Sequence, residues 1–112
     1  MIKNTDKRII NMIIEKIDRL TEVCTNNTLE KIEESYVLSD TLQFEFEKMY
    51  NDCTKLSSEF YISFPSFPID QLRGIRNRVA HDYESVVIRV MYDAVVGDLP
   101  SVKATLQSFL EA

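Results

Sequence analysis

Apolar residues recur along most of the chain at alternating intervals of three and four positions. The first such stripe, within a segment from about Asp6 to Thr25, consists of Ile10, Ile13, Ile17, Leu20 and Cys24. The second consists of Leu42, Phe46, Met49, Cys53 and Leu56. This spacing places the apolar side chains on one face of an α-helix and the charged residues on the other. The pattern predicts an all-α fold.

Polar residues between the stripes predict where helices begin and end. Asp6 is expected to cap the first helix and Asn26-Asn27 to end it. Asn27-Thr28-Leu29-Glu30 has the pattern of a capping box at the start of a short second helix. Ser39-Asp40 is expected to end that helix and to cap the one that carries the second stripe.

The second half of the chain resumes the helical pattern at Ile69. The next apolar positions are Leu72, Ile75 and Val79. A further helix is expected from Val86, with its end at Gly97. The Val-rich residues 85–96 are also compatible with a strand, but a single strand would have nothing to pair with. Asp98-Leu99-Pro100 predicts the start of a last short helix, because proline is favoured in the first helical turn.

The segment from Ser57 to Phe67 is rich in aromatic residues. They are Phe60, Tyr61, Phe64 and Phe67. Prolines at 65 and 68 predict a connector without a helix. Aromatic rings in a loop can stack on nucleobases, but more often they pin the loop to the core, and we favour this second interpretation.

These elements predict one domain over residues 1–112, an up-and-down bundle of five to six antiparallel helices. Only two glycines and three prolines interrupt the chain, too few for the many turns of an all-β protein. Several helices carry apolar residues outside their main stripe, among them Met12, Phe44 and Tyr50. A bundle of this size has little interior to bury them, so we expect a homodimer.

The cysteines and the absence of long apolar runs indicate the compartment. The sequence has no run of about 18 apolar residues, and its N-terminal segment lacks the apolar core of a signal peptide. Cys24 and Cys53 could pair, but two cysteines without a secretion signal are more often reduced and buried. Their spacing and the single histidine, His81, match no zinc site. We expect a cytoplasmic protein with no membrane segment, cofactor or metal ion.

Charge is unevenly distributed along the chain. The net charge of −5 argues against binding nucleic acid through a broadly basic surface. Residues 30–59 contain eight acidic residues and three lysines, which is typical of a solvated face. Residues 71–90 contain four arginines against Asp82 and Glu84. An anionic ligand would be favoured at this arginine cluster.

The stretch Arg76-Asn77-Arg78-Val79-Ala80-His81-Asp82-Tyr83 lies in the cluster and holds the only histidine. A histidine moves protons near neutral pH, and an arginine binds phosphate and stabilises charge in a transition state. Together they suit cleavage of RNA by its own 2′-hydroxyl, a group that DNA lacks. The structural alternative is that His81 caps a helix end while the arginines pair with Asp70, Asp82 and Glu84.

Helix geometry separates the members of this stretch. At about 100° per residue, Arg76 and His81 lie about 140° apart around an unbroken helix, whereas Tyr83 shares the face of Arg76. Asn77 and His81 are four residues apart, so the amide of Asn77 could hydrogen-bond the imidazole ring. Either the helix ends near His81, or a second copy of the chain completes the site.

The spacing Arg76-x4-His81-x-Tyr83 resembles the Arg-x4-His-x-Tyr signature of the HEPN superfamily, and specifically of its HepT-like toxins. Asn77 matches the polar residue that follows the arginine there. The resemblance covers about residues 42–102. It includes Leu56-Ser57, Phe67-Pro68, Leu72-Arg73-Gly74-Ile75 and Asp98-Leu99-Pro100. The family often has a tryptophan where this chain has Ile69, a departure that bears on packing rather than on chemistry.

The resemblance implies an all-helical, dimeric, metal-independent ribonuclease that is the toxin of a type VII-like toxin–antitoxin pair. Arg76 and His81 would be catalytic, with the motifs of the two protomers facing each other across a cleft. The supporting residues would be Asn77, Arg73 and Arg78. A minimal nucleotidyltransferase antitoxin would transfer AMP from ATP to Tyr83. The substrate would be RNA, for which tRNA is one candidate.

Two other functions stay open at the level of sequence. One is a HEPN module that binds a nucleotide or the nucleotidyltransferase without turnover. The other is a purely structural helical dimer, which a buried and fully paired Arg76 and His81 would favour. Cleavage of RNA in the presence of EDTA separates the ribonuclease from both.

Overall fold

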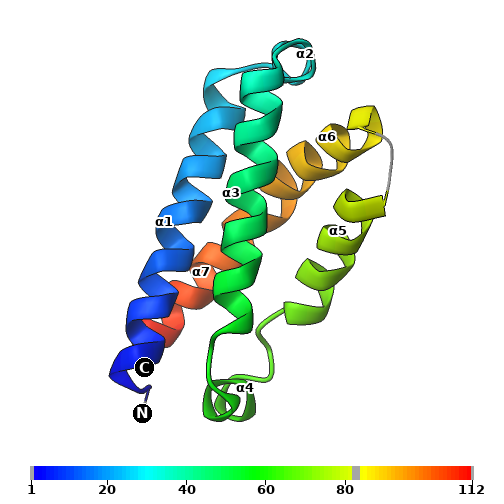
Figure 1. The fold of residues 1–112 in the computed structure, drawn as a ribbon. Coiled ribbons are helices and arrows are strands. Elements are labelled where there is room, and N and C mark those ends of the chain that lie inside the picture. The colour runs from blue at the N-terminus through cyan, green and yellow to red at the C-terminus, as the bar shows by residue number, and fades with distance from the viewer. Residues whose placement is uncertain (1, 82–83, 112) are drawn as a thin grey trace.

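The structure is a computed structural model that describes residues 2–81 and 84–111; of His81, Glu84 and Ser85 it describes the backbone alone. Within these ranges the secondary structure is entirely helical (Figure 1). The all-α fold predicted from the apolar stripes is therefore confirmed. None of the described helices is long and apolar enough to cross a membrane.

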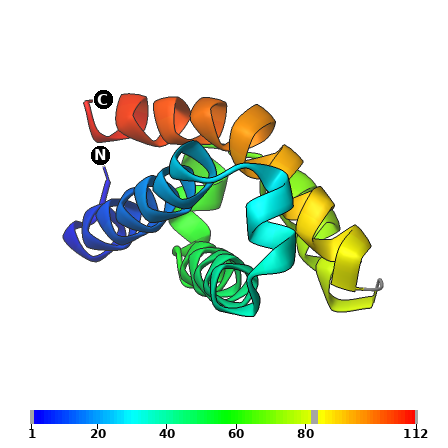
Figure 2. The ribbon, with the colours of Figure 1, turned by 90° about the horizontal axis from the view of Figure 1, so that it is seen from above.

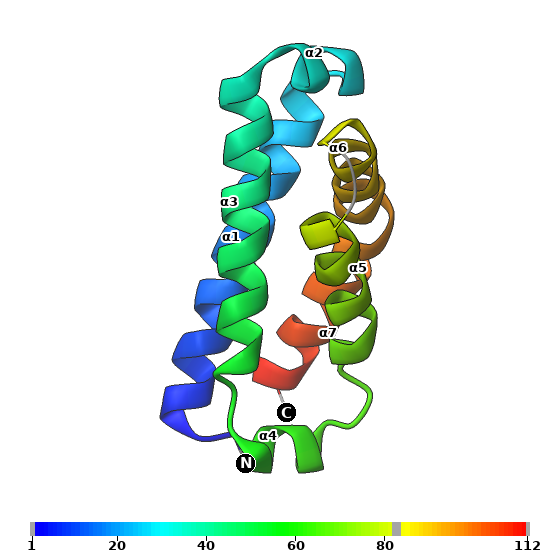
Figure 3. The same ribbon diagram turned by 45° about the vertical axis from the view of Figure 1, so that its right-hand side comes forward.

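Two long helices, α1 (Asn4–Asn26) and α3 (Tyr36–Thr54), lie side by side along the bundle (Figures 1 and 3). Every residue of the two predicted stripes is buried, so the stripes meet in one core. The short helix α2 (Leu29–Glu34) joins the two long ones. Thr28 caps α2, because its hydroxyl oxygen accepts a hydrogen bond from the amide of Lys31. Lys31 and not Glu30 is the third residue of the helix, so the predicted capping box does not form.

Asp6 does not cap the first helix, so this prediction is wrong. α1 already begins at Asn4, after Lys3, whose side chain forms no cap. The Asp6 carboxylate is buried in the first turn and accepts hydrogen bonds from the amide and the hydroxyl of Ser57, at 2.9 and 2.6 Å. Asp6 therefore holds the start of the next short helix, α4 (Ser58–Ser63), against α1.

Ser39-Asp40 lies inside α3 and not between two helices, which corrects the predicted boundary. Ser35 ends α2 and caps α3, and its hydroxyl oxygen accepts a hydrogen bond from the amide of Leu38. Ser39 is buried, and its hydroxyl donates to the carbonyl of Ile32 at 2.7 Å. The hydroxyl that suggested a break instead joins the end of α2 to α3.

The aromatic segment contains the helix α4, where the sequence predicted none. Ser57 caps α4 by accepting a hydrogen bond from the amide of Phe60, and the two prolines follow the helix instead of interrupting it. The favoured interpretation of the aromatic rings is confirmed, since Phe60 and Phe67 are buried. Rings in contact with Phe60 are Tyr61, Phe64, Phe67 and Phe109. The segment is thereby pinned to α7 (Leu99–Leu110).

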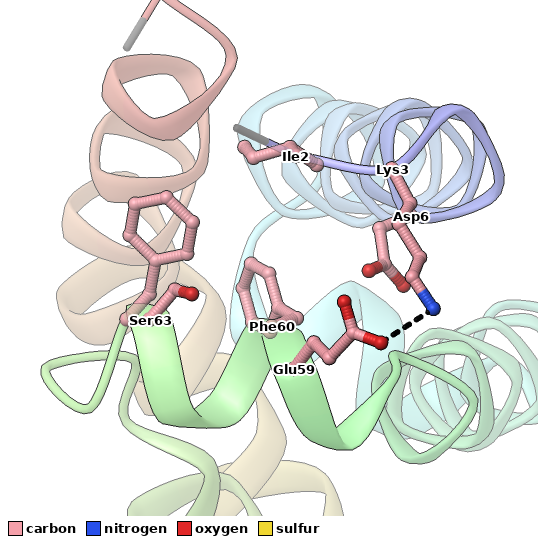
Figure 4. Close-up of a pocket in the computed structure, with 7 residues that line it drawn as sticks. Ile2, Lys3, Asp6, Glu59, Phe60 and Ser63 are labelled. Atoms are coloured by element: carbon pink, nitrogen blue, oxygen red, sulfur yellow. Dashed lines mark ion pairs between the residues drawn. The ribbon is translucent and has the colours of Figure 1, made fainter.

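A small cavity lies where α4 meets the N-terminal residues (Figure 4). Its volume is about 30 Å³, and Ile2, Asp6 and Phe60 are among the residues that line it. Lys3 closes it from one side through an ion pair with Glu59, at 2.8 Å. A space of this size holds about one or two water molecules. We therefore regard it as a packing feature between α1 and α4.

The second half of the chain lies beside α3. α5 (Ile69–His81) and α6 (Glu84–Asp93) both contact α3, and α6 runs through a π-helical segment, η1 (Ala94–Asp98), into α7, which packs on α1. Figure 2 shows α6, η1 and α7 as one bent helical run along one side of the bundle. Residues 85–96 are thus helical, and the alternative of a strand does not apply.

Gly97 does not end a helix, contrary to the sequence-based prediction. It lies inside η1, where the amide of Leu99 donates to the carbonyl of Ala94, five residues earlier. The wider turn of a π-helix accommodates an extra residue without breaking the helix. Here it keeps Val95 and Leu99 both buried in the core. Pro100 lies in the first turn of α7, as predicted.

Candidate active site

The arginine cluster is carried by α5. This helix begins just after Pro68 and remains helical through His81, the last residue described before position 84. Positions 76 and 81 therefore lie about 140° apart around one continuous helix. The described residues do not include the side chain of His81 or any part of Tyr83, so the expectations that concern them stay predictions.

Arg76 faces α3. One of its terminal nitrogens lies 3.4 Å from a carboxylate oxygen of Glu47, and its guanidinium carbon lies 6.0 Å from the centre of the Tyr50 ring. The side chain is 40% exposed, yet its Nε atom is buried without a hydrogen-bond partner. Arg76 is thus neither buried nor fully paired. A purely structural role of the motif would require both, so the state of Arg76 does not favour that role.

Arg73 lies one turn before Arg76 and shares its contact with α3. Its guanidinium forms an ion pair with Asp70 at 2.6 Å, as the structural alternative expected. The Tyr50 hydroxyl first, and then the Asp70 carboxylate, raise the pKa of the Arg73 guanidinium. Arg73 and Arg76 thus both interact with Tyr50. Arg76 pairs with Glu47 of α3, which the alternative did not name; Asp82 and the side chain of Glu84 lie outside the described residues.

Arg78 is separated from these two arginines. It lines an open groove with Glu33 of α2 and with several residues of α6. The α6 residues are Val86, Arg89, Val90 and Asp93. Asn77 is exposed between the two faces. Of the three predicted supporting residues, Arg73 is the one that shares the contact of Arg76 with Tyr50.

Glu47 and Tyr50 were missed by the sequence analysis. The acidic stretch that contains Glu47 was interpreted as a solvated face, and Tyr50 as an apolar residue outside the main stripe. The two are three residues apart, so they share one face of α3. Their partner on α5 could not be known without the packing of α5 on α3.

The described side chains contain no group of three or more histidines, cysteines, aspartates or glutamates placed to hold a metal ion. What the arrangement offers is a partly exposed guanidinium, held from one side, on the helix that ends at the single histidine. A guanidinium of this kind can bind a phosphate group through two parallel hydrogen bonds.

Comparison with known proteins gives a family match over most of the chain. The family model described as "Ribonuclease HepT-like" matches residues 13–109. No solved structure matches the chain. The matched range includes α2 to α6 and the entire Arg76-to-Tyr83 stretch.

Proposed function

The chain belongs to the HepT-like ribonuclease family, and on this premise we propose that it is a metal-independent endoribonuclease that acts as the toxin of a type VII-like toxin–antitoxin system. The observation that carries the proposal is the state of Arg76. Its guanidinium is partly exposed, weakly paired and on the same helix as His81. An arginine that served only to tie α5 to α3 would be expected to be buried and fully paired.

In the proposed reaction, the 2′-oxygen of a ribose attacks the neighbouring phosphorus. The bond from phosphorus to the 5′-oxygen of the next nucleotide breaks, which leaves a 2′,3′-cyclic phosphate and a 5′-hydroxyl. His81 takes the proton of the 2′-hydroxyl or gives one to the leaving oxygen. Arg76 binds the phosphate and stabilises the negative charge that builds up in the transition state.

The proposed site is shared between two copies of the chain. Positions 76 and 81 lie on different faces of α5, so one protomer cannot easily bring both side chains to one phosphate. Mixing Arg76→Ala protein with His81→Ala protein tests this. If each site takes Arg76 from one protomer and His81 from the other, mixed dimers regain cleavage. A monomer in sedimentation at micromolar concentration, or no recovery on mixing, would contradict the shared site.

Control of the toxin is proposed to act through Tyr83. A minimal nucleotidyltransferase antitoxin would attach AMP to it, and the added phosphate would compete for the arginines that bind RNA. Mass spectrometry of the chain co-expressed with this enzyme should show the mass of AMP on Tyr83. The Tyr83→Phe variant should stay unmodified and toxic. AMP on another residue, or no modification, would count against this mode of control.

A binding module without turnover is the second candidate. It predicts that the protein retains RNA or nucleotide but leaves RNA uncut. The net charge of −5 means that RNA binding should be local to the site and sensitive to salt in either case. The appearance of cyclic-phosphate ends therefore decides between the two candidates.

A further inference from the structure

Two side chains of α3, Tyr50 and Glu47, contact the guanidinium of Arg76. We propose that Tyr50 and Glu47 are positioning residues for Arg76. Glu47 pairs with the Arg76 guanidinium until an RNA phosphate replaces it. This inference rests on the proposed ribonuclease function. In the resting state Arg76 pairs with Glu47, and in the working state it binds an RNA phosphate.

Tyr50 supplies the fixed surface. Its side chain is buried, with 8% exposed, so its ring cannot move far. The guanidinium carbon of Arg76 lies 6.0 Å from the ring centre, within the range of a cation–π contact. The Tyr50 hydroxyl raises the pKa of the neighbouring Arg73 guanidinium. A planar guanidinium on such a ring keeps its plane even when its hydrogen-bond partner changes.

Glu47 is a partner of Arg76 that a phosphate can displace. Its oxygen lies 3.4 Å from Arg76, whereas the ion pair between Arg19 and Glu15 on α1 measures 2.6 Å. Both members of the Arg76 pair are about two-fifths exposed, at 40% and 43%, so water screens their attraction. A phosphate that accepts two hydrogen bonds from the guanidinium would be the stronger partner.

The Nε atom of Arg76 favours the replacement of Glu47 by a phosphate. It is buried and has no acceptor, and an unsatisfied buried donor is unfavourable. If Glu47 releases the guanidinium, a small rotation can bring Nε and a terminal nitrogen to the same phosphate. Release of Glu47 thus relieves the unsatisfied donor and creates the paired donors that a phosphate prefers.

Steady-state cleavage of RNA separates the two roles. Glu47→Gln keeps an acceptor for Arg76 but loses the competing charge, so KM should fall by up to about fivefold while kcat stays close to wild type. Tyr50→Leu removes the ring, so kcat should fall by about tenfold or more through misorientation of the guanidinium. Tyr50→Phe keeps the ring and should largely restore kcat. Glu15→Gln, which removes the charge from a remote Glu–Arg pair, is the matched control.

Unchanged kcat in Tyr50→Leu, or unchanged KM in Glu47→Gln, would overturn the positioning roles. So would a loss of activity that simply follows the loss of thermal stability across the variants. The proposed function can fail independently, since a wild-type protein that cuts no RNA contradicts it at once.

NMR tests the positioning of Arg76 by Tyr50 even if the protein cuts no RNA. The Nε–H signal of Arg76 in NMR spectra, assigned with Arg76→Lys, should exchange slowly with water in the wild-type protein because the atom is buried. Exchange should become about tenfold faster or more in Tyr50→Leu and stay slow in Glu15→Gln. Equal exchange in Tyr50→Leu and wild type would show that the ring does not hold Arg76.

Discussion

Lys16 of α1 and Asp52 of α3 form an ion pair inside the bundle. The Lys16 Nζ lies 2.5 Å from an Asp52 oxygen, and the side chains are only 10% and 7% exposed. The pair joins the two longest of the described helices, which pack against each other along the bundle. It fixes one relative position of α1 and α3, because any shift would leave two charges buried without partners.

Replacement of one member of this pair should strongly destabilise the fold. Lys16→Met leaves the Asp52 carboxylate buried and unpaired, so the free energy of unfolding should fall by about 3–5 kcal/mol in urea denaturation. The double variant Lys16→Met, Asp52→Leu should recover most of that loss. The exposed pair of Lys103 and Asp18 is the control, and Lys103→Met should cost less than about 1 kcal/mol. Equal losses in Lys16→Met and Lys103→Met would contradict this account.

The link between Asp6 and Ser57 should matter for the end of the bundle that contains α4. Asp6→Ala removes the acceptor of two hydrogen bonds, one from a backbone amide, and should lower the free energy of unfolding by about 1–3 kcal/mol. Hydrogen exchange should increase mainly in α4. Exchange that increases equally over all helices, with no excess in α4, would argue against a local role.

The aromatic segment should act through stability and not through RNA binding. Phe60→Ala removes a buried ring that contacts four others, so we expect a loss of about 3–5 kcal/mol. Ile62→Ala in the same helix replaces a side chain that is 79% exposed and should change stability by less than about 0.5 kcal/mol. RNA affinity per folded molecule should be the same in both variants. Weaker RNA binding by folded Phe60→Ala protein would revive the interpretation as a stacking platform.

The buried thiols predict a loss of stability in alkali. Burial raises the pKa of Cys24 to about 11, and burial together with the nearby Asp52 charge raises that of Cys53 to about 12. In an unfolded chain a thiol titrates near pH 8.5. The folded state therefore keeps protons that the unfolded state loses, so this contribution is complete below about pH 8 and decreases as the pH rises toward 12.

Thiol labelling checks that the two cysteines are buried in the folded protein. At pH 8 a disulfide reagent should react with the native protein only as fast as it unfolds, and with both cysteines at once in denaturant. Both cysteines are free and buried, as the sequence analysis favoured. Rapid labelling of the native protein at pH 7 would show that one of them is accessible.

The sequence predicted the elements whose signal is local. The stripes of α1 and α3 appeared at helical spacing, and each of their residues is buried. Serines and aspartates were harder to interpret, because one hydroxyl or carboxylate can cap its own helix or bind a distant amide. Asp6 and Ser39 both took distant or neighbouring-helix partners, and no pattern in the sequence distinguishes that outcome.

The site was predictable in part for the same reason. Arg73 and Arg76 could be recognised by their type and spacing, and the match over residues 13–109 agrees with the family suggested by the motif. Tyr50 and Glu47 depend on the packing of α5 against α3, which joins residues 29 positions apart. Packing also places Arg78 toward α2 and α6, although it is only two residues from Arg76.

Arg76 and His81 are proposed to cleave RNA together. The most direct measurement is the rate at which purified protein cuts RNA in excess EDTA, with the ends analysed for 2′,3′-cyclic phosphate. Wild type and the control Arg8→Ala should cut, whereas Arg76→Ala and His81→Ala should be slower by about 100-fold or more with unchanged unfolding midpoints. Intact RNA with wild-type protein, or a His81→Ala variant as fast as wild type, would contradict the claim.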